Sequence, residues 1–424
     1  MKANHDLAAR WGTPLYVYDL DRVTAAYRDL RNSLPPGVMI YYSLKANPHP
    51  DIARALREAE RWPSCRAEIS STGELAAALE AGFAAGECLY TGPGKTEGEL
   101  IAAIMQGVRM FSVESLTDLE RAGSIALRFG CVIDSLLRIN SVSPGAATSI
   151  RMMGKPSQFG IDSETLDVQL PMLRAVPGTR LVGAHFFSQS NARDEASLLS
   201  ELTQSVVVAA RLEADHGLPM KILDIGGGFA APYAVPGERP QYRRMRVELG
   251  NALDAYFPHW RSGVPLVICE SGRYLVGDCG ELVSSVINIK ESRGSRFVIL
   301  DAGINTLGGM AGLGRLMPLA VKPDDAYAQD DADAATLVGP LCTPGDVLGR
   351  SVRLHSPEVG DIVTIPNVGA YGVTASLLLF LSRPAPHEVV LRNGEVLTVS
   401  QLQVRRNAER SLSTVTTPQL NGQG

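Results

Sequence analysis

Several strand-like segments of this sequence end in residues that could do chemistry, and the first of these ends at Lys45. Lys45 follows the apolar run Val38–Leu44. A lysine at the tip of a strand is often a surface residue, but a desolvated lysine has a lowered pKa and can form a Schiff base. Lys45 is therefore a candidate covalent anchor for a carbonyl compound.

Three later segments supply groups that would complement such an amine. Gly226–Gly228 follow an apolar run, and the backbone N–H groups of successive glycines can surround a phosphate, although glycine-rich turns are also common. Glu270 and Arg273 lie three residues apart and could form no more than a local ion pair. His185 is either a hydrogen-bonded core residue or a flat ring that stacks on an aromatic cofactor. Together these groups match the needs of pyridoxal phosphate.

The elements that must position these groups alternate between strands and helices. Eight short apolar runs have strand-like composition: Val38–Leu44, Ala67–Ser70, Cys88–Thr91, Met110–Val113, Ser135–Ile139, Leu181–Phe187, Lys221–Ile225 and Leu266–Cys269. Helical periodicity fills stretches between them, such as Gly73–Ala81, Leu116–Phe129 and Ala196–His216. A doubly wound sheet would alternate in the same way, but a count of eight favours a (β/α)8 TIM-type barrel, whose active sites lie at the C-terminal ends of the strands.

The pattern changes after about residue 281, which predicts a second, mostly β domain. Strand-like runs there are Val283–Ile289, Arg296–Asp301, Asp361–Pro366 and Glu388–Leu391. Residues 11–20 also look like a strand and could join that domain. The predicted division is therefore a barrel over 30–280, a discontinuous β domain over 1–29 and 281–405, and a flexible tail over 406–424. The acidic stretch Asp324–Ala335 is expected to be a surface loop.

Composition excludes several classes of protein. The 424 residues carry a formal net charge of −5 without a basic stripe, which argues against nucleic-acid binding. No apolar stretch reaches the length of a membrane span, and the N-terminus lacks the apolar core of a signal peptide, so the cytoplasm is the expected compartment. The six cysteines have no zinc-ligand spacing, and no metal is predicted.

The chain resembles the ornithine/diaminopimelate/arginine decarboxylase family, the fold-type III pyridoxal-phosphate decarboxylases. The segments that carry the resemblance are YYSLKAN, EISSTGEL, DIGGGF, CESGRYLV, GPLCTPGD and GAYG, and it extends from about Thr13 to about Ser382. The resemblance implies a homodimer with shared active sites and a cofactor held by Lys45. It implies further cofactor contacts from Glu68, Arg138, His185, Ser188, Gly226, Gly227, Gly228, Glu270, Arg273 and Tyr371.

Two residues of this set bear on the type of reaction. A carboxylate at the pyridine nitrogen, here Glu270, keeps that nitrogen protonated and the ring a strong electron sink, which favours decarboxylation. Related racemases place an arginine there instead. Cys342 corresponds to the family's catalytic cysteine from the partner subunit and would return a proton to the α-carbon. A small buried thiol is the alternative for Cys342, but its Gly-Pro and Pro-Gly neighbours predict an exposed turn.

The sequence departs from diaminopimelate decarboxylases where the distal end of the substrate would lie. Gly309 occupies a stretch that usually carries an arginine and a tyrosine, with Arg315 as the nearest cation. Thr343 replaces an acidic residue, Gln158 a lysine, and Phe187 a glycine. We therefore expect an amino-acid conjugate, bound to a carrier protein or part of a natural-product or siderophore pathway. A true diaminopimelate decarboxylase, an amino-acid racemase and a non-catalytic cofactor-binding homologue remain the alternatives, and missing ligand clusters disfavour a metal-dependent hydrolase.

Overall fold

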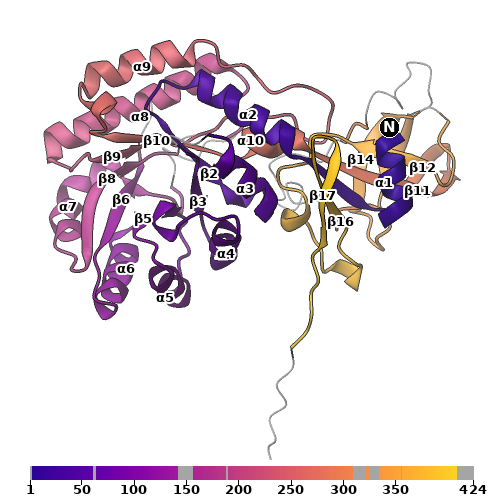
Figure 1. The fold of residues 1–424 in the computed structure, drawn as a ribbon, viewed down its shortest axis with the longest axis horizontal. Coiled ribbons are helices and arrows are strands. Elements are labelled where there is room, and N and C mark those ends of the chain that lie inside the picture. Colours follow the sequence, from indigo (N-terminus) through magenta and orange to yellow (C-terminus); the bar gives the residue numbers. More distant parts are fainter. Residues whose placement is uncertain are drawn as a thin grey trace, which may run out of the picture.

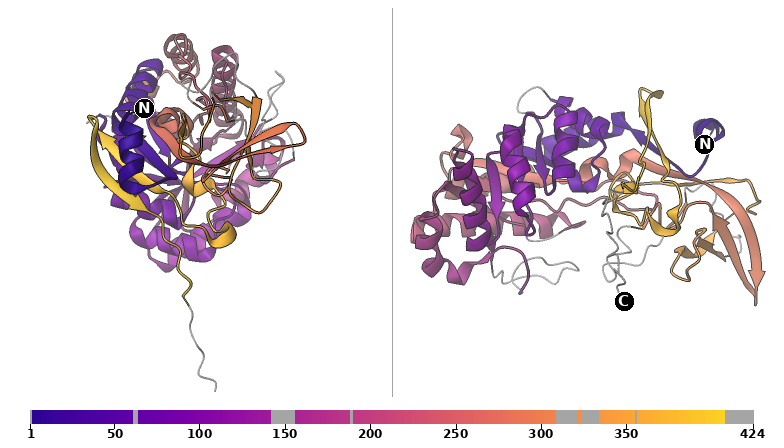
Figure 2. Two further views of the ribbon diagram at one scale, coloured as in Figure 1. Left: turned by 90° about the vertical axis from the view of Figure 1, so that its right-hand side faces the viewer. Right: turned by 90° about the horizontal axis from the view of Figure 1, so that it is seen from below.

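A computed structural model shows the chain as a barrel joined to a mostly β domain (Figure 1). It describes residues 2–60, 64–141, 156–187, 190–308, 321–323, 334–354 and 356–407. The barrel and the β domain lie side by side along the long axis of the molecule, with the N-terminus on the β-domain side (Figures 1 and 2). This arrangement confirms the predicted fold class.

Eight parallel strands close into the barrel. Their order around it is β5-β4-β3-β2-β10-β9-β8-β6, and β6 pairs with β5 to close the ring, while the short β7 (Ile161–Asp162) pairs with the end of β6. The strands are β2 (Met39–Ser43), β3 (Arg66–Ile69), β4 (Cys88–Tyr90), β5 (Met110–Val113), β6 (Ile133–Asn140), β8 (Thr179–His185), β9 (Ile222–Asp224) and β10 (Leu266–Ser271). All eight predicted strands are therefore confirmed, with boundaries that differ by a few residues.

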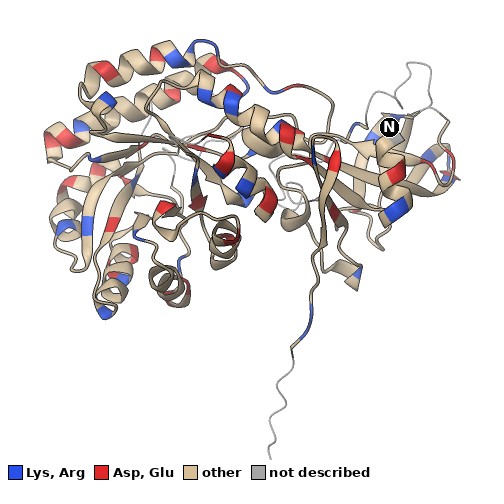
Figure 3. Cartoon of the chain, in the orientation of Figure 1, with Lys and Arg blue, Asp and Glu red and all other residues tan. Residues whose placement is uncertain are grey.

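Helices cover the outside of this barrel (Figure 2). They are α2 (Leu20–Ser33), α3 (Pro50–Glu58), α4 (Thr72–Glu80), α5 (Glu97–Gln106), α6 (Leu116–Arg128), α7 (Leu166–Arg174), α8 (Glu195–His216), α9 (Met245–Tyr256) and α10 (Arg273–Val276). Local sequence sets their ends: Thr96 and Glu99 form a capping box that starts α5, and Gly107, at φ 103°, ends it. Acidic and basic side chains are interspersed over these helices (Figure 3).

Alternation along each strand divides the apolar residues between two sides of the barrel wall. In β2, Met39 and Tyr41 point into the barrel, where they pack with Leu136 and Ile268 in a small buried cluster. Their neighbour Tyr42 belongs instead to the large cluster between strands and helices. The period of two along the strand thus fills the barrel and attaches the helices at the same time.

A second sheet forms the β domain. Its order is β14-β13-β12-β11-β1-β16-β17, with β15 also paired to β11. The strands are β1 (Leu15–Asp19), β11 (Gly280–Ser292), β12 (Ser295–Leu300), β13 (Ala334–Val338), β14 (Val347–Arg353), β15 (Ile362–Ile365), β16 (His387–Arg392) and β17 (Glu395–Gln401). The N-terminal strand β1 thus lies between β11 and β16, more than 260 residues away in the chain. The precise domain boundaries stay a prediction.

Some of this domain differs from expectation. A helix, α1 (Lys2–Trp11), precedes β1, and its Ala8 packs on Leu15 and Val389 of the sheet. Strands β13, β14 and β17 were not predicted, and Ala334 and Ala335 belong to β13 rather than to a surface loop, because the sheet pairs them with β12 and β14. The rest of that predicted loop and most of the predicted tail lie outside the described residues. None of the described helices has the length and apolar character needed to span a membrane.

One close approach between barrel strands yields a test of this packing. Gly183 of β8 has no room for a side chain, since a Cβ would lie 1.7 Å from the carbonyl oxygen of Ile222 in β9. Gly183→Ala should lower the free energy of unfolding by about 3 kcal/mol or prevent folding, measured by chemical denaturation. The control is Gly98→Ala in α5, where a Cβ meets nothing within 4 Å. Equal stabilities of the two variants would contradict the packing described here.

Candidate active site

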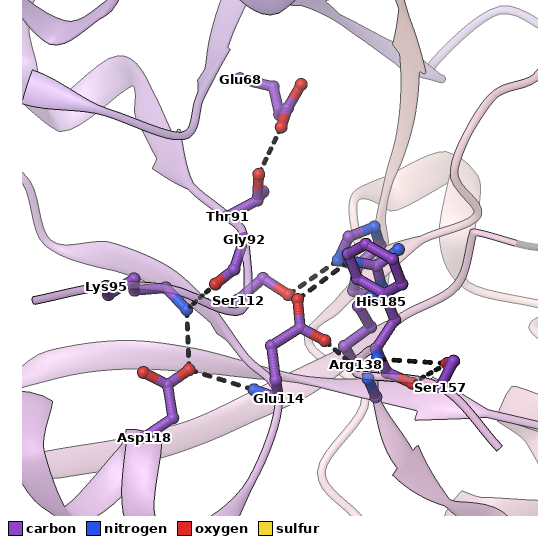
Figure 4. Close-up of polar contacts among 12 residues, drawn as sticks. Glu68, Thr91, Gly92, Lys95, Ser112, Glu114, Asp118, Arg138, Ser157 and His185 are labelled. Carbon is purple, nitrogen blue, oxygen red and sulfur yellow. Dashed lines mark hydrogen bonds and ion pairs between the residues drawn. The ribbon is translucent and has the colours of Figure 1, made fainter. Parts of the chain in front are cut away.

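Lys45 lies at the C-terminal end of β2, in a single helical turn (Leu44–Ala46). Its Nζ donates hydrogen bonds to both carboxylate oxygens of Glu68, at 3.1 and 2.9 Å. The Lys45 side chain is 40% exposed, whereas Glu68, in β3, is 1% exposed. Thr91, which follows β4, also donates a hydrogen bond to Glu68 (Figure 4). An accessible amine thus rests on a buried carboxylate.

The pKa of Lys45 is raised in the cofactor-free chain, contrary to the expectation of a lowered value. Burial alone would lower this pKa, but the negative charges of Glu68 and Glu270 and the hydrogen bonds to Glu68 outweigh it. Sequence reasoning counted the desolvation of the amine and named Glu68 as a cofactor contact, but it did not foresee the ion pair between the two residues. Lys45 is therefore held as a cation by its ion pair until another group takes its place beside Glu68.

His185 lies at the end of β8, and side chains from other barrel strands surround it. Ser112 Oγ lies 2.7 Å from His185 Nδ1, and Glu270 Oε1 lies 3.5 Å from His185 Nε2. Burial, followed by the nearby positive charges of Arg138 and Lys45, lowers the pKa of His185 well below its usual value, so the ring is neutral. A neutral, fixed imidazole is suited to stack against a flat aromatic ring.

Glu270 ends β10 beside a second buried carboxyl group, Asp224, at the end of β9. His185, Asp224 and Glu270 bring ligand-type atoms within 4.8 Å of one another, which would also suit a metal ion. His185 Nε2, Glu270 Oε1 and Asp224 Oδ2 are all buried and have no hydrogen-bond partner in the structure. Such atoms are rare in folded proteins unless a further group binds there.

The glycine run after β9 passes close to β8 and β10. A Cβ on Gly226 would lie 2.2 Å from the carbonyl oxygen of Phe186, and one on Gly227 would lie 2.0 Å from that of Glu270. Gly226 and Gly228 also have φ values of 74° and 108°, which glycine adopts most readily. Glycine is therefore required at Gly226 and Gly227 for the chain to pass this close to β8 and β10.

The β domain closes this rim through Tyr371. Its N–H donates to the carbonyl oxygen of Ala46, next to Lys45, at 2.7 Å. Its ring lies 5.1 Å from the guanidinium carbon of Arg273, and Tyr233 donates a hydrogen bond to its carbonyl oxygen. Arg273 and Tyr371, about 100 residues apart in the sequence, thus meet where the β domain contacts the turn of Lys45.

Arg138, from the end of β6, belongs to a separate buried cluster. Its Nη1 donates to Glu114 Oε1 at 2.9 Å, and the other oxygen of Glu114 accepts from Gly160 N at 2.6 Å (Figure 4). The guanidinium carbon lies 4.6 Å from the ring of Phe159 and 5.9 Å from that of Phe187. Arg138 is therefore charge-paired and flanked by aromatic rings.

Phe187 also faces the amine, because its ring lies 5.8 Å from Lys45 Nζ. The ring thus lies near both Lys45 and Arg138, at the position where the sequence departs from the family pattern. An opening of about 400 Å³ adjoins Lys45 on another side and is lined by Ser71, Glu74 and Thr374, among others. Ser71, Glu74 and Thr374 therefore line an opening that leads to the amine of Lys45.

The structure does not bring Cys342 and Thr343 to Lys45 within one chain. Cys342 is exposed, as predicted, in a turn of the β domain, and no hydrogen bond or ion pair joins either residue to the barrel residues described above. Asp346 shapes this turn by accepting hydrogen bonds from Leu341 N and Ile304 N. The predicted Ser188, Gly309 and Arg315 lie outside the described residues.

Sequence reasoning missed several polar residues of the rim. Ser112, Glu114, Thr91 and Asp224 all lie at or just after the C-terminal end of a barrel strand. The strand-end rule that singled out Lys45 would have found them, had it been applied to strands without an unusual motif.

The residues fit pyridoxal phosphate by the chemistry of their donors and acceptors. The amine suits the aldehyde of that cofactor, and the neutral imidazole suits its flat ring. The unpartnered buried carboxyl oxygen suits the ring nitrogen. The glycine run, with an arginine and a tyrosine, suits the phosphate. The same carboxyl and imidazole atoms could hold a metal ion, but a metal would leave the paired Lys45 and the glycine rim without a role.

The ion pair beneath Lys45 can be tested in the cofactor-free protein. Glu68→Gln removes the charge that raises the pKa of Lys45, so the amine should become reactive at a pH about one unit lower or more. The rate of Lys45 modification by an amine reagent, followed by mass spectrometry between pH 7 and 10.5, measures this. Glu74→Gln is the control, because Glu74 binds Ser70 rather than Lys45. An unchanged profile for Glu68→Gln would show that Glu68 does not set the pKa.

Comparison with known proteins agrees with this assignment. Residues 20–277 match the family described as "Pyridoxal-dependent decarboxylase, pyridoxal binding domain". The chain is 32% identical over 397 residues to the L-glutamyl-[BtrI acyl-carrier protein] decarboxylase of Niallia circulans, which covers 92% of this chain and 91% of that protein. It is 30% identical over 383 residues to the 2-[(L-alanin-3-ylcarbamoyl)methyl]-2-hydroxybutanedioate decarboxylase of Staphylococcus aureus, covering 89% and 93%.

Comparison with solved structures gives a similar result. The structure of diaminopimelate decarboxylase from M. jannaschii in complex with L-lysine aligns with a TM-score of 0.80 and 26% identity, over 92% of this chain and 90% of that one. The match of sequence, fold and rim chemistry assigns the cofactor as pyridoxal phosphate and the activity as that of an amino-acid decarboxylase. The chain belongs to the fold-type III pyridoxal-phosphate-dependent decarboxylases.

Proposed function

We propose that this enzyme removes the α-carboxyl group from an amino-acid conjugate, and not from a diamino acid with a free distal ammonium, and that it does so in the cytoplasm. The observation that carries the proposal is Thr343, a neutral side chain beside the proposed catalytic cysteine, where the sequence pattern of diaminopimelate decarboxylases has an acid. The names of two relatives that align over about nine tenths of the chain support it, since one acts on a carrier-bound glutamyl group and the other on an alanine-linked conjugate.

The cofactor contacts proposed from the sequence follow the rim. Lys45 would hold the cofactor covalently and His185 would stack on its ring. Glu270 would face the ring nitrogen. The phosphate would be bound by Gly226, Gly227, Gly228, Arg273 and Tyr371, together with Ser188. Glu68 and Arg138 would complete the set. Glu68 pairs with Lys45. Arg138, which is held by its ion pair with Glu114, would fix another part of the rim.

The chain's own residues have defined tasks in this reaction. When bound, the cofactor withdraws the electron pair left behind by carbon dioxide. Glu270 would stabilise the positive ring nitrogen that this requires, and its burial would strengthen the interaction because few waters compete. Glu68 would hold the free Lys45 amine as a cation. Cys342 would then return a proton from its thiol to the α-carbon.

Because no hydrogen bond or ion pair joins Cys342 to the described residues of the rim, we propose that the partner chain of a homodimer supplies it and that the sites are shared. The β domain has an exposed apolar surface for such contact, formed by Leu377, Leu379, Phe380, Leu381, Val396, Leu397, Val399, Leu402 and Val404. A patch of this kind on a single chain is typical of an interface. A hollow of about 690 Å³ lies within it, lined in part by Leu379, Arg383 and Leu402. Arg383 also donates to the carbonyl oxygen of Pro340, which connects this surface to the Cys342 turn.

Two inactive variants test the shared site. Cys342→Ala should bind the cofactor normally but lose productive turnover, because no thiol protonates the α-carbon, and Lys45→Ala should lose covalent attachment. An equal mixture of the two variants should regain about a quarter of the wild-type rate of carbon dioxide release, since about half of the dimers are mixed and one of the two sites in each mixed dimer keeps both residues. Two variants of the same type mixed together serve as the control. Failure to recover activity, with mixed dimers demonstrated, would contradict the exchange of Cys342.

The substrate is tested by direct comparison of carbon dioxide release. An aminoacyl group tethered through its side chain to a carrier protein should have a kcat/KM at least about tenfold above that of free diaminopimelate, because a free distal ammonium would face Thr343 without a carboxylate. The matched variant Thr343→Asp should shift the preference toward diaminopimelate. Robust wild-type turnover of diaminopimelate alone would refute the proposal, and turnover without carbon dioxide release would favour a racemase.

A further inference from the structure

Asp224 is a fully buried carboxyl group that the proposed mechanism does not use. It ends β9, directly before the glycine run, and its Oδ1 accepts a hydrogen bond from Gly226 N at 2.9 Å. Its Oδ2 is buried without a partner, and so is Glu270 Oε1. These two carboxyl groups and His185 converge within 4.8 Å. Two unpartnered acid oxygens at such close range, with His185 neutral beside them, require an explanation.

The nearby cations are already committed to other carboxylates. Lys45 binds Glu68, and Arg138 binds Glu114. The titratable and charged groups that surround Asp224 and Glu270 are Glu68 of β3, Tyr41 of β2, Arg138 of β6, His185 of β8, Cys269 of β10 and Lys45. Among them, neither cation makes a hydrogen bond to Asp224 or Glu270. Two like charges buried at this distance cannot both persist, so one proton between them is the stable arrangement.

We propose that Asp224 is a positioning residue that shares one proton with Glu270 in the cofactor-free site and must itself be protonated when Glu270 pairs with the cofactor's ring nitrogen. This inference rests on the proposed role of Glu270. In balanced form, the proton on the carboxyl pair moves to the ring nitrogen, Glu270 remains as a carboxylate, and Asp224 takes one proton from solvent. The Asp224 O–H then donates to Glu270 and orients it.

The electrostatics of the pair agree with this assignment. Burial raises the pKa of Asp224 to about 7, although the hydrogen bond from Gly226 N opposes the rise. Burial, followed by the charges of Glu68 and Asp224, raises the pKa of Glu270 well above its usual value. Above about pH 7 the cofactor-free pair therefore holds fewer than two protons. The bound state needs two, one on the ring nitrogen and one on Asp224. Cofactor binding in that range must take up a proton.

The experiment measures cofactor affinity and proton uptake between pH 6 and 9 for the wild type, Asp224→Asn and Asp224→Ala. Wild-type affinity should fall about tenfold more than that of Asp224→Asn between pH 7.5 and 8.5, because one extra proton is needed. Calorimetry in two buffers with different ionisation enthalpies should find about one proton more taken up by the wild type at pH 8. Asp224→Asn keeps an acceptor for Gly226 N, so the backbone turn is preserved.

A matched control separates this effect from the removal of any buried acid. Glu388→Gln removes another buried carboxyl group whose pKa burial raises to about 7, and which accepts from Tyr18 in the β domain. Its affinity and proton uptake should follow the wild type at every pH. If Asp224→Asn also follows the wild type while Asp224→Ala loses the cofactor, Asp224 only supports the turn and the proposal is wrong.

A second variant keeps the test decisive if Asp224→Asn does not fold. Glu270→Gln leaves no carboxylate to repel Asp224, so the extra proton uptake should disappear even though affinity falls. Wild-type proton uptake in Glu270→Gln would overturn the proposal. A wild-type protein that shows no covalent cofactor at Lys45 would instead count against the proposed cofactor contacts, which keeps the two failures distinct.

Discussion

Closing a parallel barrel forces the ends of eight strands into one small rim, and the charges that those ends carry must be balanced there. Four buried carboxyl groups are subject to this constraint: Glu68, Glu114, Asp224 and Glu270. Burial of an unpaired charge is costly, so each needs a cation or a proton. Lys45 and Arg138 neutralise the first two. The remaining two lie beside the glycine run without a hydrogen bond from a cation, and this imbalance makes the rim receptive to a positively charged ring nitrogen.

The same rim depends on the β domain. Tyr371 and Gly369 reach the turn that contains Lys45, through hydrogen bonds with Ala46 O and Asn47 Nδ2. Strand β1, at the other end of the chain, is paired into the same sheet before the chain enters α2. The sheet is therefore attached to the barrel by its first strand and by its late loops, so that residues near both ends of the sequence fix the position of the amine.

Sequence alone predicted the eight strands well, because short apolar runs that are buried on both faces leave a strong signal. It also identified Lys45, His185, Glu270 and the glycine run, whose residue types are unusual at strand ends. It did not reveal the ion pair of Lys45 with Glu68 as the dominant influence on the pKa, since that depends on two strands being adjacent. Strand β17 was missed for a different reason: every residue but the last is exposed, so no alternation of buried and exposed positions marks it.

The hydrogen bond from Tyr371 N to Ala46 O has a consequence for how such a protein can be divided or altered. The barrel looks like a complete unit in outline, but the turn that presents its amine is bonded to backbone from the other domain. A barrel produced by itself would leave that turn, the stacked Arg273 and the carbonyl of Ala46 facing water. The barrel and the sheet therefore form one structural unit. A change of substrate is more readily accommodated by the side chains that line the rim than by exchange of a whole domain.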